Sequence, residues 1–288
     1  MVYSLENGQI RLEVSSKGAE IMSLKKGGRE YIWQGDARFW KDRAINLFPI
    51  VGRLWEGNYT YKGREYRMGI HGFAKDMEFE LKKADENSLY FTLSDNEETR
   101  RVYPFGFELL ITYTIDGSCA ACKYHVANTG NEEMPFGIGG HPGFIFPPEG
   151  EAGEWFLEFE EGCRPEKVLL EDSFITGKTA GFPLREGSKI LFDSATLTQF
   201  VDTIILRGAG QKVSLKSDKY PQKITVRYPG FKYIAFWKSA EQSPFLCIEP
   251  WHSLPSYCGK VDSLEGKRDM VLLNSGNSFK IGFEIEIE

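Results

Sequence analysis

The chain of 288 residues lacks both an excess of positive charge and any long hydrophobic run. Its formal net charge is −6, so no overall basic field attracts a nucleic acid. No apolar stretch approaches the roughly 20 residues that span a bilayer. The first residues combine no charged region with an apolar core, so we expect no signal peptide. These features argue against nucleic acid or membrane as partners.

Cysteine is scarce as well. The five cysteines are an odd, scattered set, as expected of reduced thiols in a cytoplasmic protein. Cys119 and Cys122 form a CxxC pair within a strand-like run. Side chains three apart on a strand face opposite ways, which indicates packing rather than redox or zinc chemistry. A Walker-type glycine loop and a GxSxG elbow are both missing.

Alternation of apolar and polar residues is the dominant local pattern. Strict alternation covers Ile10–Val14, Met77–Leu81 and Phe279–Glu288, and predicts strands with one buried face. Further strand-like runs are Leu89–Leu93, Leu109–Ile115, Lys123–Val126, Trp155–Phe159, Ile204–Leu206, Lys223–Tyr228, Tyr233–Trp237 and Phe245–Ile248.

Turns and breaks in the pattern complete the fold prediction. The 30 glycines and 13 prolines are spread along the chain, which indicates many tight turns. Asp36–Arg43 could form a helical turn or two, and the Pro- and Gly-rich stretch Met134–Gly150 is interpreted as a folded loop region. No composition break marks a domain boundary. We therefore predict an all-β protein, with residues 1–288 forming a single large antiparallel β-sandwich or barrel-like domain.

Two of the four histidines are flanked by glycines. His71 lies in Gly-Ile-His-Gly-Phe, and His141 lies in Gly-Gly-His-Pro-Gly-Phe. Glycines this close to a histidine let a ligand or another backbone approach it. A turn with a structurally satisfied histidine is the alternative for either residue alone, but two such sites together favour a function.

An apolar run ends in the carboxylate of Glu249, followed by Pro250 and Trp251. A buried glutamate has a raised pKa and can act as a base; a salt bridge to a neighbouring loop is the alternative. Arg53 follows a glycine in an apolar setting and can donate several hydrogen bonds to hydroxyls or to a carboxylate. A structural Arg–Glu pair is an equally good interpretation of Arg53.

Four segments, in this order, resemble the galactose mutarotase-like family of aldose 1-epimerases, and the lactose-operon X proteins of bacteria in particular. The resemblance covers almost the whole chain. The segments are Gly52-Arg53, His71-Gly72-Phe73, Gly139-Gly140-His141-Pro142-Gly143-Phe144 and Cys247-Ile248-Glu249-Pro250-Trp251.

The resemblance implies a β-supersandwich and a sugar site that needs no metal and no cofactor. It implies that His141 is the general acid, which protonates the ring oxygen, and that Glu249 is the general base. Arg53 and His71 match substrate-positioning residues, and Asp202 matches an aspartate that binds sugar hydroxyls. The implied partner is a small aldose, and we expect a monomer or weak homodimer.

Three alternatives remain open. A hexose-6-phosphate 1-epimerase of the same fold would need cations at the cleft rim, for which Arg38, Lys41, Arg43 and Lys75 are available. A non-catalytic carbohydrate-binding or sensing protein would not need an acid–base pair. A glycoside hydrolase would need a second carboxylate close to the first.

Aromatic side chains supply a further prediction. Phe73, Phe144 and Trp251 lie within the motifs, and each could stack on the apolar face of a pyranose or belong to the core.

Overall fold

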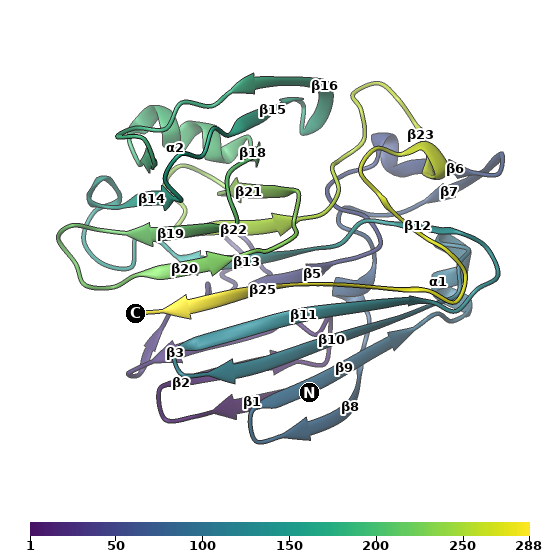
Figure 1. Cartoon of the computed structure of the whole chain (residues 1–288), viewed down its shortest axis with the longest axis horizontal. Coiled ribbons are helices and arrows are strands. Elements are labelled where there is room, and N and C mark those ends of the chain that lie inside the picture. The colour runs from purple at the N-terminus through teal and green to yellow at the C-terminus, as the bar shows by residue number, and fades with distance from the viewer.

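The computed structural model describes all residues from Met1 to Glu288, and its largest element is a nine-stranded antiparallel sheet (Figure 1). On β25 the alternating residues Phe283, Ile285 and Ile287 are buried, while Glu284 and Glu286 are not. Alternation thus turns one face of the sheet to the core. The strand order is β17 (Lys189–Leu191), β14 (Phe156–Phe159), β19 (Lys212–Lys216), β20 (Ile224–Arg227), β25 (Ser278–Ile287), β11 (Cys119–Asn128), β10 (Phe107–Asp116), β9 (Ser88–Ser94) and β8 (Glu80–Asp85).

A seven-stranded antiparallel sheet lies beside it. Two strands near its centre, Tyr233–Trp237 and Phe245–Trp251, are buried along almost their whole length and therefore consist of largely apolar runs rather than of alternating residues. The strand order is β16 (Phe174–Gly181), β15 (Glu166–Glu171), β18 (Ile204–Arg207), β21 (Tyr233–Trp237), β22 (Phe245–Trp251), β13 (Gly139–Ile145) and β5 (Ala44–Leu47).

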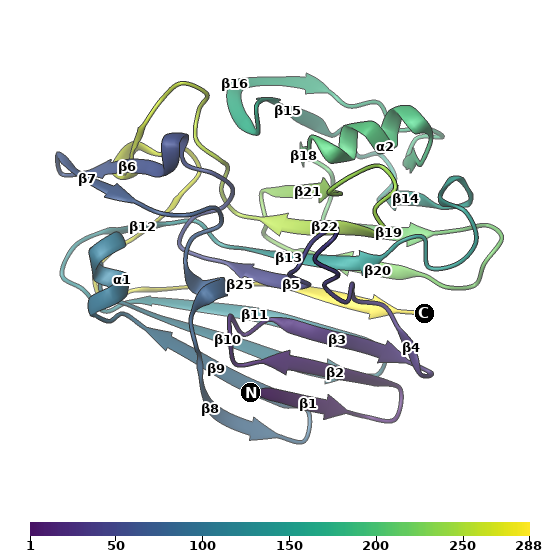
Figure 2. The same cartoon turned by 180° about the vertical axis from the view of Figure 1, so that it is seen from behind.

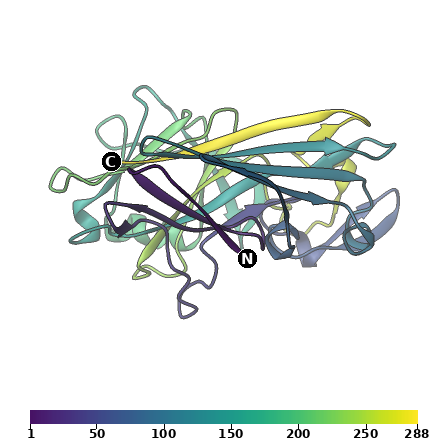
Figure 3. The same ribbon diagram turned by 90° about the horizontal axis from the view of Figure 1, so that it is seen from below.

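Three smaller sheets and two short helices complete the chain. Figure 2 shows the four-stranded sheet over part of the nine-stranded one, and Figure 3 shows these layers edge-on. No helix is long and apolar enough to cross a membrane. The small sheets are β1 (Val2–Glu6), β2 (Ile10–Ser15), β3 (Ile21–Lys26) and β4 (Arg29–Glu30); β12 (Met134–Phe136) and β24 (Val271–Leu273); and β23 (Asp262–Ser263), β6 (Asn58–Tyr61) and β7 (Arg64–Arg67). The helices are α1 (Glu97–Val102) and α2 (Ser194–Val201).

The main hydrophobic core joins the sheets. It contains 63 buried residues, with members from all five sheets. Phe159 of β14 contacts Phe236 of β21, with ring centroids 6.0 Å apart. The hydroxyl of Tyr124 on β11 donates a hydrogen bond to the carbonyl of Gly139 on β13 at 3.1 Å. The back of β13 is therefore fixed against the larger sheet, and its other face is available for a site.

The prediction of an antiparallel all-β fold is confirmed; only β23 and β6 pair in parallel. The helical turn predicted within Asp36–Arg43 is present and is closed by a hydrogen bond from the Trp40 N–H to the Asp36 carbonyl. Two local predictions need correction. The stretch interpreted as a loop contains β12 and β13. The alternation at Met77–Leu81 precedes the regular strand, which begins at Glu80.

Glycine and proline disfavour strands in general, which is why the interpretation of Met134–Gly150 was wrong. In β13 the glycines are required by close packing. A Cβ atom on Gly140 would lie 2.5 Å from the ring of Phe283, and one on Gly139 would lie 2.7 Å from the carbonyl oxygen of Pro250. The strand that carries His141 can therefore fit between its neighbours only with glycine at these positions.

Candidate active site

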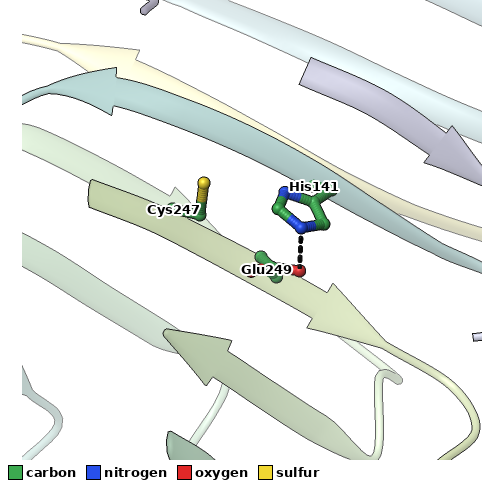
Figure 4. Close-up of side chains that lie close together, drawn as sticks. All are labelled: His141, Cys247 and Glu249. Atoms are coloured by element: carbon green, nitrogen blue, oxygen red, sulfur yellow. Dashed lines mark ion pairs between the residues drawn. The ribbon is translucent and has the colours of Figure 1, made fainter. Parts of the chain in front are cut away.

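His141 and Glu249 face each other on adjacent strands. Gly139 pairs with Trp251, and Gly143 pairs with Cys247, so the antiparallel register sets His141 directly opposite Glu249. Opposed residues on neighbouring strands project from the same face of a sheet. His141 and Glu249 are 108 residues apart in the sequence (249 − 141), and the strand pairing therefore brings their two motifs together (Figure 4).

The two side chains are in direct contact. Nε2 of His141 lies 3.1 Å from Oε2 of Glu249, and the side chains are only 7% and 1% exposed. Nδ1 of His141 and Oε1 of Glu249 are buried without any hydrogen-bond partner. Buried polar atoms are rarely left unpaired in native proteins, so two such atoms on one pair indicate a site built for another molecule.

Burial controls the protonation of the pair. It raises the pKa of Glu249 well above its ordinary value, and it lowers the pKa of His141 to about 3. Both shifts favour the uncharged form of the group, because a charge loses its hydration when it is buried. The site therefore holds a neutral carboxylic acid beside a neutral imidazole. These two groups can exchange one proton across their 3.1 Å contact.

His71 lies next to this pair with its ring fixed. Its main-chain N–H donates to the Gly52 carbonyl at 2.9 Å, and the Gly52 N–H donates to its Nδ1 at 3.1 Å. Since Nδ1 accepts, the proton of the neutral ring is on Nε2. Burial lowers the pKa of His71 well below its ordinary value, and the neighbouring His141, Lys75 and Arg53 disfavour a charge on His71 in the same direction. His71 is thus a neutral hydrogen-bond donor, with its ring centroid 5.2 Å from that of His141.

Glycine is required beside both Arg53 and His71. Gly52 has a φ of +73°, and a Cβ atom there would lie 2.4 Å from the ring of Pro255. Gly72 has a φ of +76°, and a Cβ atom there would lie 2.2 Å from the carbonyl oxygen of Phe48. The glycines of these motifs therefore allow the tight packing that holds His71 and Arg53 at the site.

Arg53 lies at the opening of the site. Arg53 is exposed, and its main-chain carbonyl accepts a hydrogen bond from the Ser256 N–H at 2.8 Å. No carboxylate pairs with its guanidinium, which excludes the structural Arg–Glu pair considered for it. Its five N–H donors are free for a ligand in the cavity.

Asp202 is not brought together with the other four predicted residues. It is exposed at the C-terminal end of α2, where its charge acts on Lys167. Its neighbours Val201 and Thr203 line the cavity, but Asp202 does not.

A cavity of about 380 Å³ opens over these residues. That volume lies within the usual range of small-molecule sites. Its aromatic lining comes from Trp40, Trp237 and Trp251, and the Trp40 ring packs against His141 at a tilt of 34°, with centroids 4.8 Å apart. The whole lining is Trp40, Lys41, Asp42, Ile45, Gly52, Arg53, Ile70, His71, Lys75, His141, Leu170, Ser173, Val201, Thr203, Ile205, Trp237, Glu249, Trp251 and Pro255.

Of the three aromatic residues predicted to stack on a sugar or to belong to the core, only Trp251 lines the cavity. Phe144 is fully buried in the main core, and Phe73 packs against that core. Trp40 and Trp237 were missed. The signal available for Trp40 was an aromatic residue directly before the charged run Lys41-Asp42-Arg43, and Trp237 ends a predicted strand.

Known proteins resemble the chain along its whole length. The family model described as aldose 1-epimerase matches residues 1–262. The chain belongs to the aldose 1-epimerase family. It is 31% identical to the chromosomal LacX protein of Lactococcus lactis subsp. lactis, over 100% of this chain and 99% of that protein. The predicted membership is confirmed.

Two solved structures are closely similar in fold to this chain. One is a galactose mutarotase related enzyme from Lactobacillus acidophilus, with a TM-score of 0.94 and 33% identity over 100% of this chain and 97% of that one. The other is a galactose mutarotase-like protein from Lactobacillus casei ATCC 334, with a TM-score of 0.94 and 26% identity over 100% of both chains.

Proposed function

We propose that the protein is an aldose 1-epimerase that interconverts the α and β anomers of a free hexose. The observation that carries the proposal is the buried contact between His141 and Glu249 on the floor of a sugar-sized cavity. Binding alone does not need a carboxylate and an imidazole in direct contact, which argues against a non-catalytic sugar-binding protein.

The chemistry follows from the proton that the pair shares. A shift of this proton from Glu249 to His141 produces a carboxylate and an imidazolium. Glu249 then takes the proton of the C1 hydroxyl, and His141 gives its proton to the ring oxygen as the C1–O5 bond breaks. The pair is now in the neutral form that burial favours, and the sugar is an open-chain aldehyde.

Closure completes the cycle. After rotation about the C1–C2 bond, Glu249 returns its proton to O1, and His141 takes the proton back from O5. The ring closes as the other anomer, and no atom or electron is left over. General acid and general base each contribute roughly 10²–10⁴-fold to such a reaction.

The surrounding residues would hold the sugar. We assign His71 and Arg53 as donors to its hydroxyls, and Trp251 as a surface for an apolar ring face. Asp202 stays a candidate for the distal hydroxyls, and that role requires the segment between Val201 and Thr203 to turn its carboxylate inward. Action in the cytoplasm, and a monomeric or weakly dimeric state, remain predictions.

The direct test is anomer exchange of freshly dissolved α-glucose and α-galactose, followed by NMR or polarimetry. The proposal predicts faster exchange with the protein than without it. Binding of these sugars without any acceleration would instead support a non-catalytic binding protein.

A phosphorylated hexose is a second candidate substrate, favoured by charge. Lys41, Arg53 and Lys75 all line the cavity together with one rim carboxylate, Asp42. The Lys75 ammonium also pairs with Asp76, which leaves Lys41 and Arg53 as the unpaired cations. Of the other cations considered, Arg38 pairs with Asp36, and Arg43 donates to the Met22 carbonyl and to Gln34. Acceleration with glucose 6-phosphate alone would favour this substrate over a free hexose.

A further inference from the structure

A third donor lies beside the acid–base pair. Cys247 precedes Glu249 by two residues on β22, so its side chain leaves the same face of the sheet. One donor atom each from His141, Cys247 and Glu249 lies within 4.8 Å of the other two, and all three residues are buried (Figure 4). A nitrogen, a sulfur and an oxygen donor thus lie close together beside the cavity.

These donors are not used up by other contacts. Nδ1 of His141 and Oε1 of Glu249 have no hydrogen-bond partner, and both residues are more than nine-tenths buried. Cys247 is fully buried and faces Gly143 across the strand pair, so no side chain separates its sulfur from β13. A Cβ atom at Gly143 would lie 3.4 Å from that sulfur.

We propose that His141, Cys247 and Glu249 bind a thiophilic divalent cation of the Zn²⁺ class, and that the bound cation inhibits the enzyme. Thiolate, imidazole and carboxylate are the ligands that Zn²⁺ takes in proteins, whereas Mg²⁺ and Ca²⁺ prefer oxygen alone. Three protein ligands leave a fourth position for water or a sugar hydroxyl. Tetrahedral bonds place ligand atoms roughly 3.3–3.8 Å apart, so the donors must move closer by about 1 Å.

The inhibition rests on the proposed function. A cation bound to the imidazole and the carboxylate lowers the proton affinity of both groups, so the pair could no longer move protons. Cys247 would have to release its thiol proton to bind as a thiolate. Cation binding therefore competes with the binding of protons to these groups. It blocks both ring opening and ring closure, because each step uses both groups of the pair.

The binding test needs no activity. Metal-free protein is titrated with Cd²⁺ while the thiolate-to-cadmium charge-transfer absorbance is followed, and with Zn²⁺ in a calorimeter. The matched control is Cys122→Ser, because Cys122 is equally buried on a strand but lies outside the cluster. We expect one site per chain in the wild type and in the control, and at least tenfold weaker binding in Cys247→Ala.

Three results would overturn the metal site. One is the absence of any charge-transfer band in the wild type, and another is equal binding by Cys247→Ala. The third is binding that disappears only when the partly exposed Cys163 and Cys258 are replaced, which would show adventitious thiols. Cys247→Ser serves as a second variant if Cys247→Ala does not fold.

The activity test separates this proposal from the proposed function. Zn²⁺ should inhibit anomer exchange by the wild type, a chelator should restore it, and Cys247→Ala should need at least tenfold more Zn²⁺ relative to its own metal-free rate. Equal inhibition of the variant would contradict the assigned site. If the metal-free wild type does not accelerate exchange, the proposed function fails, and the cadmium titration still decides the metal site.

Discussion

Trp251 holds Glu249 through a side-chain hydrogen bond within one strand. The indole N–H donates to Oε2 of Glu249 at 3.1 Å, the same oxygen that contacts His141. This donor lowers the pKa of the carboxyl group, against the larger opposite effect of burial. The indole thus stabilises the charged form of Glu249, the form that would accept the proton from O1.

Replacement of Trp251 by phenylalanine should therefore slow epimerisation with little loss of fold. A hydrogen bond to a charged group contributes about 1.5–3 kcal/mol, so we expect kcat to fall on the order of ten- to a hundredfold. Trp237→Phe is the matched control, because Trp237 lines the same cavity and donates to neither member of the pair. Equal loss in both variants would show that only ring packing matters.

Gly140→Ala should destabilise the protein. The added Cβ atom would lie 2.5 Å from the buried ring of Phe283, and overpacking of this kind costs about 1–3 kcal/mol. Chemical denaturation measures the effect. Gly181→Ala is the control, since a Cβ atom there meets nothing within 4 Å. An unchanged midpoint for Gly140→Ala would contradict the close packing of β13.

Lys238 should make stability depend on pH in the alkaline range. Its ammonium is buried and donates to the carbonyls of Ser243 and Phe245, and burial lowers its pKa to about 8. Between that pH and the ordinary lysine pKa the unfolded chain binds more protons than the folded one. Stability therefore rises with pH across this window, by about 3 kcal/mol in total.

Comparison with Lys238→Met isolates that contribution. The wild-type free energy of unfolding minus that of the variant should increase from pH 8 to pH 10.5, whatever other groups titrate. Urea denaturation at several pH values measures this difference. A difference that stays flat, or that falls with rising pH, would show that Lys238 is not desolvated in the folded state.

Local pattern predicts most of the large sheet. Alternation identifies Phe279–Glu288 in the large sheet, and Ile10–Val14 in the four-stranded one, because one face of each strand stays in water. It fails at Met77–Leu81, where Phe79 is buried but its N–H bonds to the Ser16 carbonyl, so the segment is extended without belonging to a regular strand. The two-residue period of a strand does not specify which other strand it pairs with.

The site could be predicted in part. His141 and Glu249 stood out by their motifs, but their contact depends on the register of β13 with β22, which no local pattern carries. The strand around His141 was not predicted because its glycines disfavour strands. Only the structure shows that Gly140 is required there by the close packing of Phe283. Trp40 could not be assigned to the site, because its contact with His141 depends on how the chain returns after β4.

The most direct test of the account compares anomer exchange by the wild type with His141→Asn and Glu249→Gln. The matched controls are His125→Asn and Glu284→Gln, which change the same residue types on β11 and β25 outside the site. The account predicts that both site variants fold normally and lose at least about a hundredfold in rate, while both controls keep it. Wild-type exchange by either site variant would contradict the assignment of the acid–base pair.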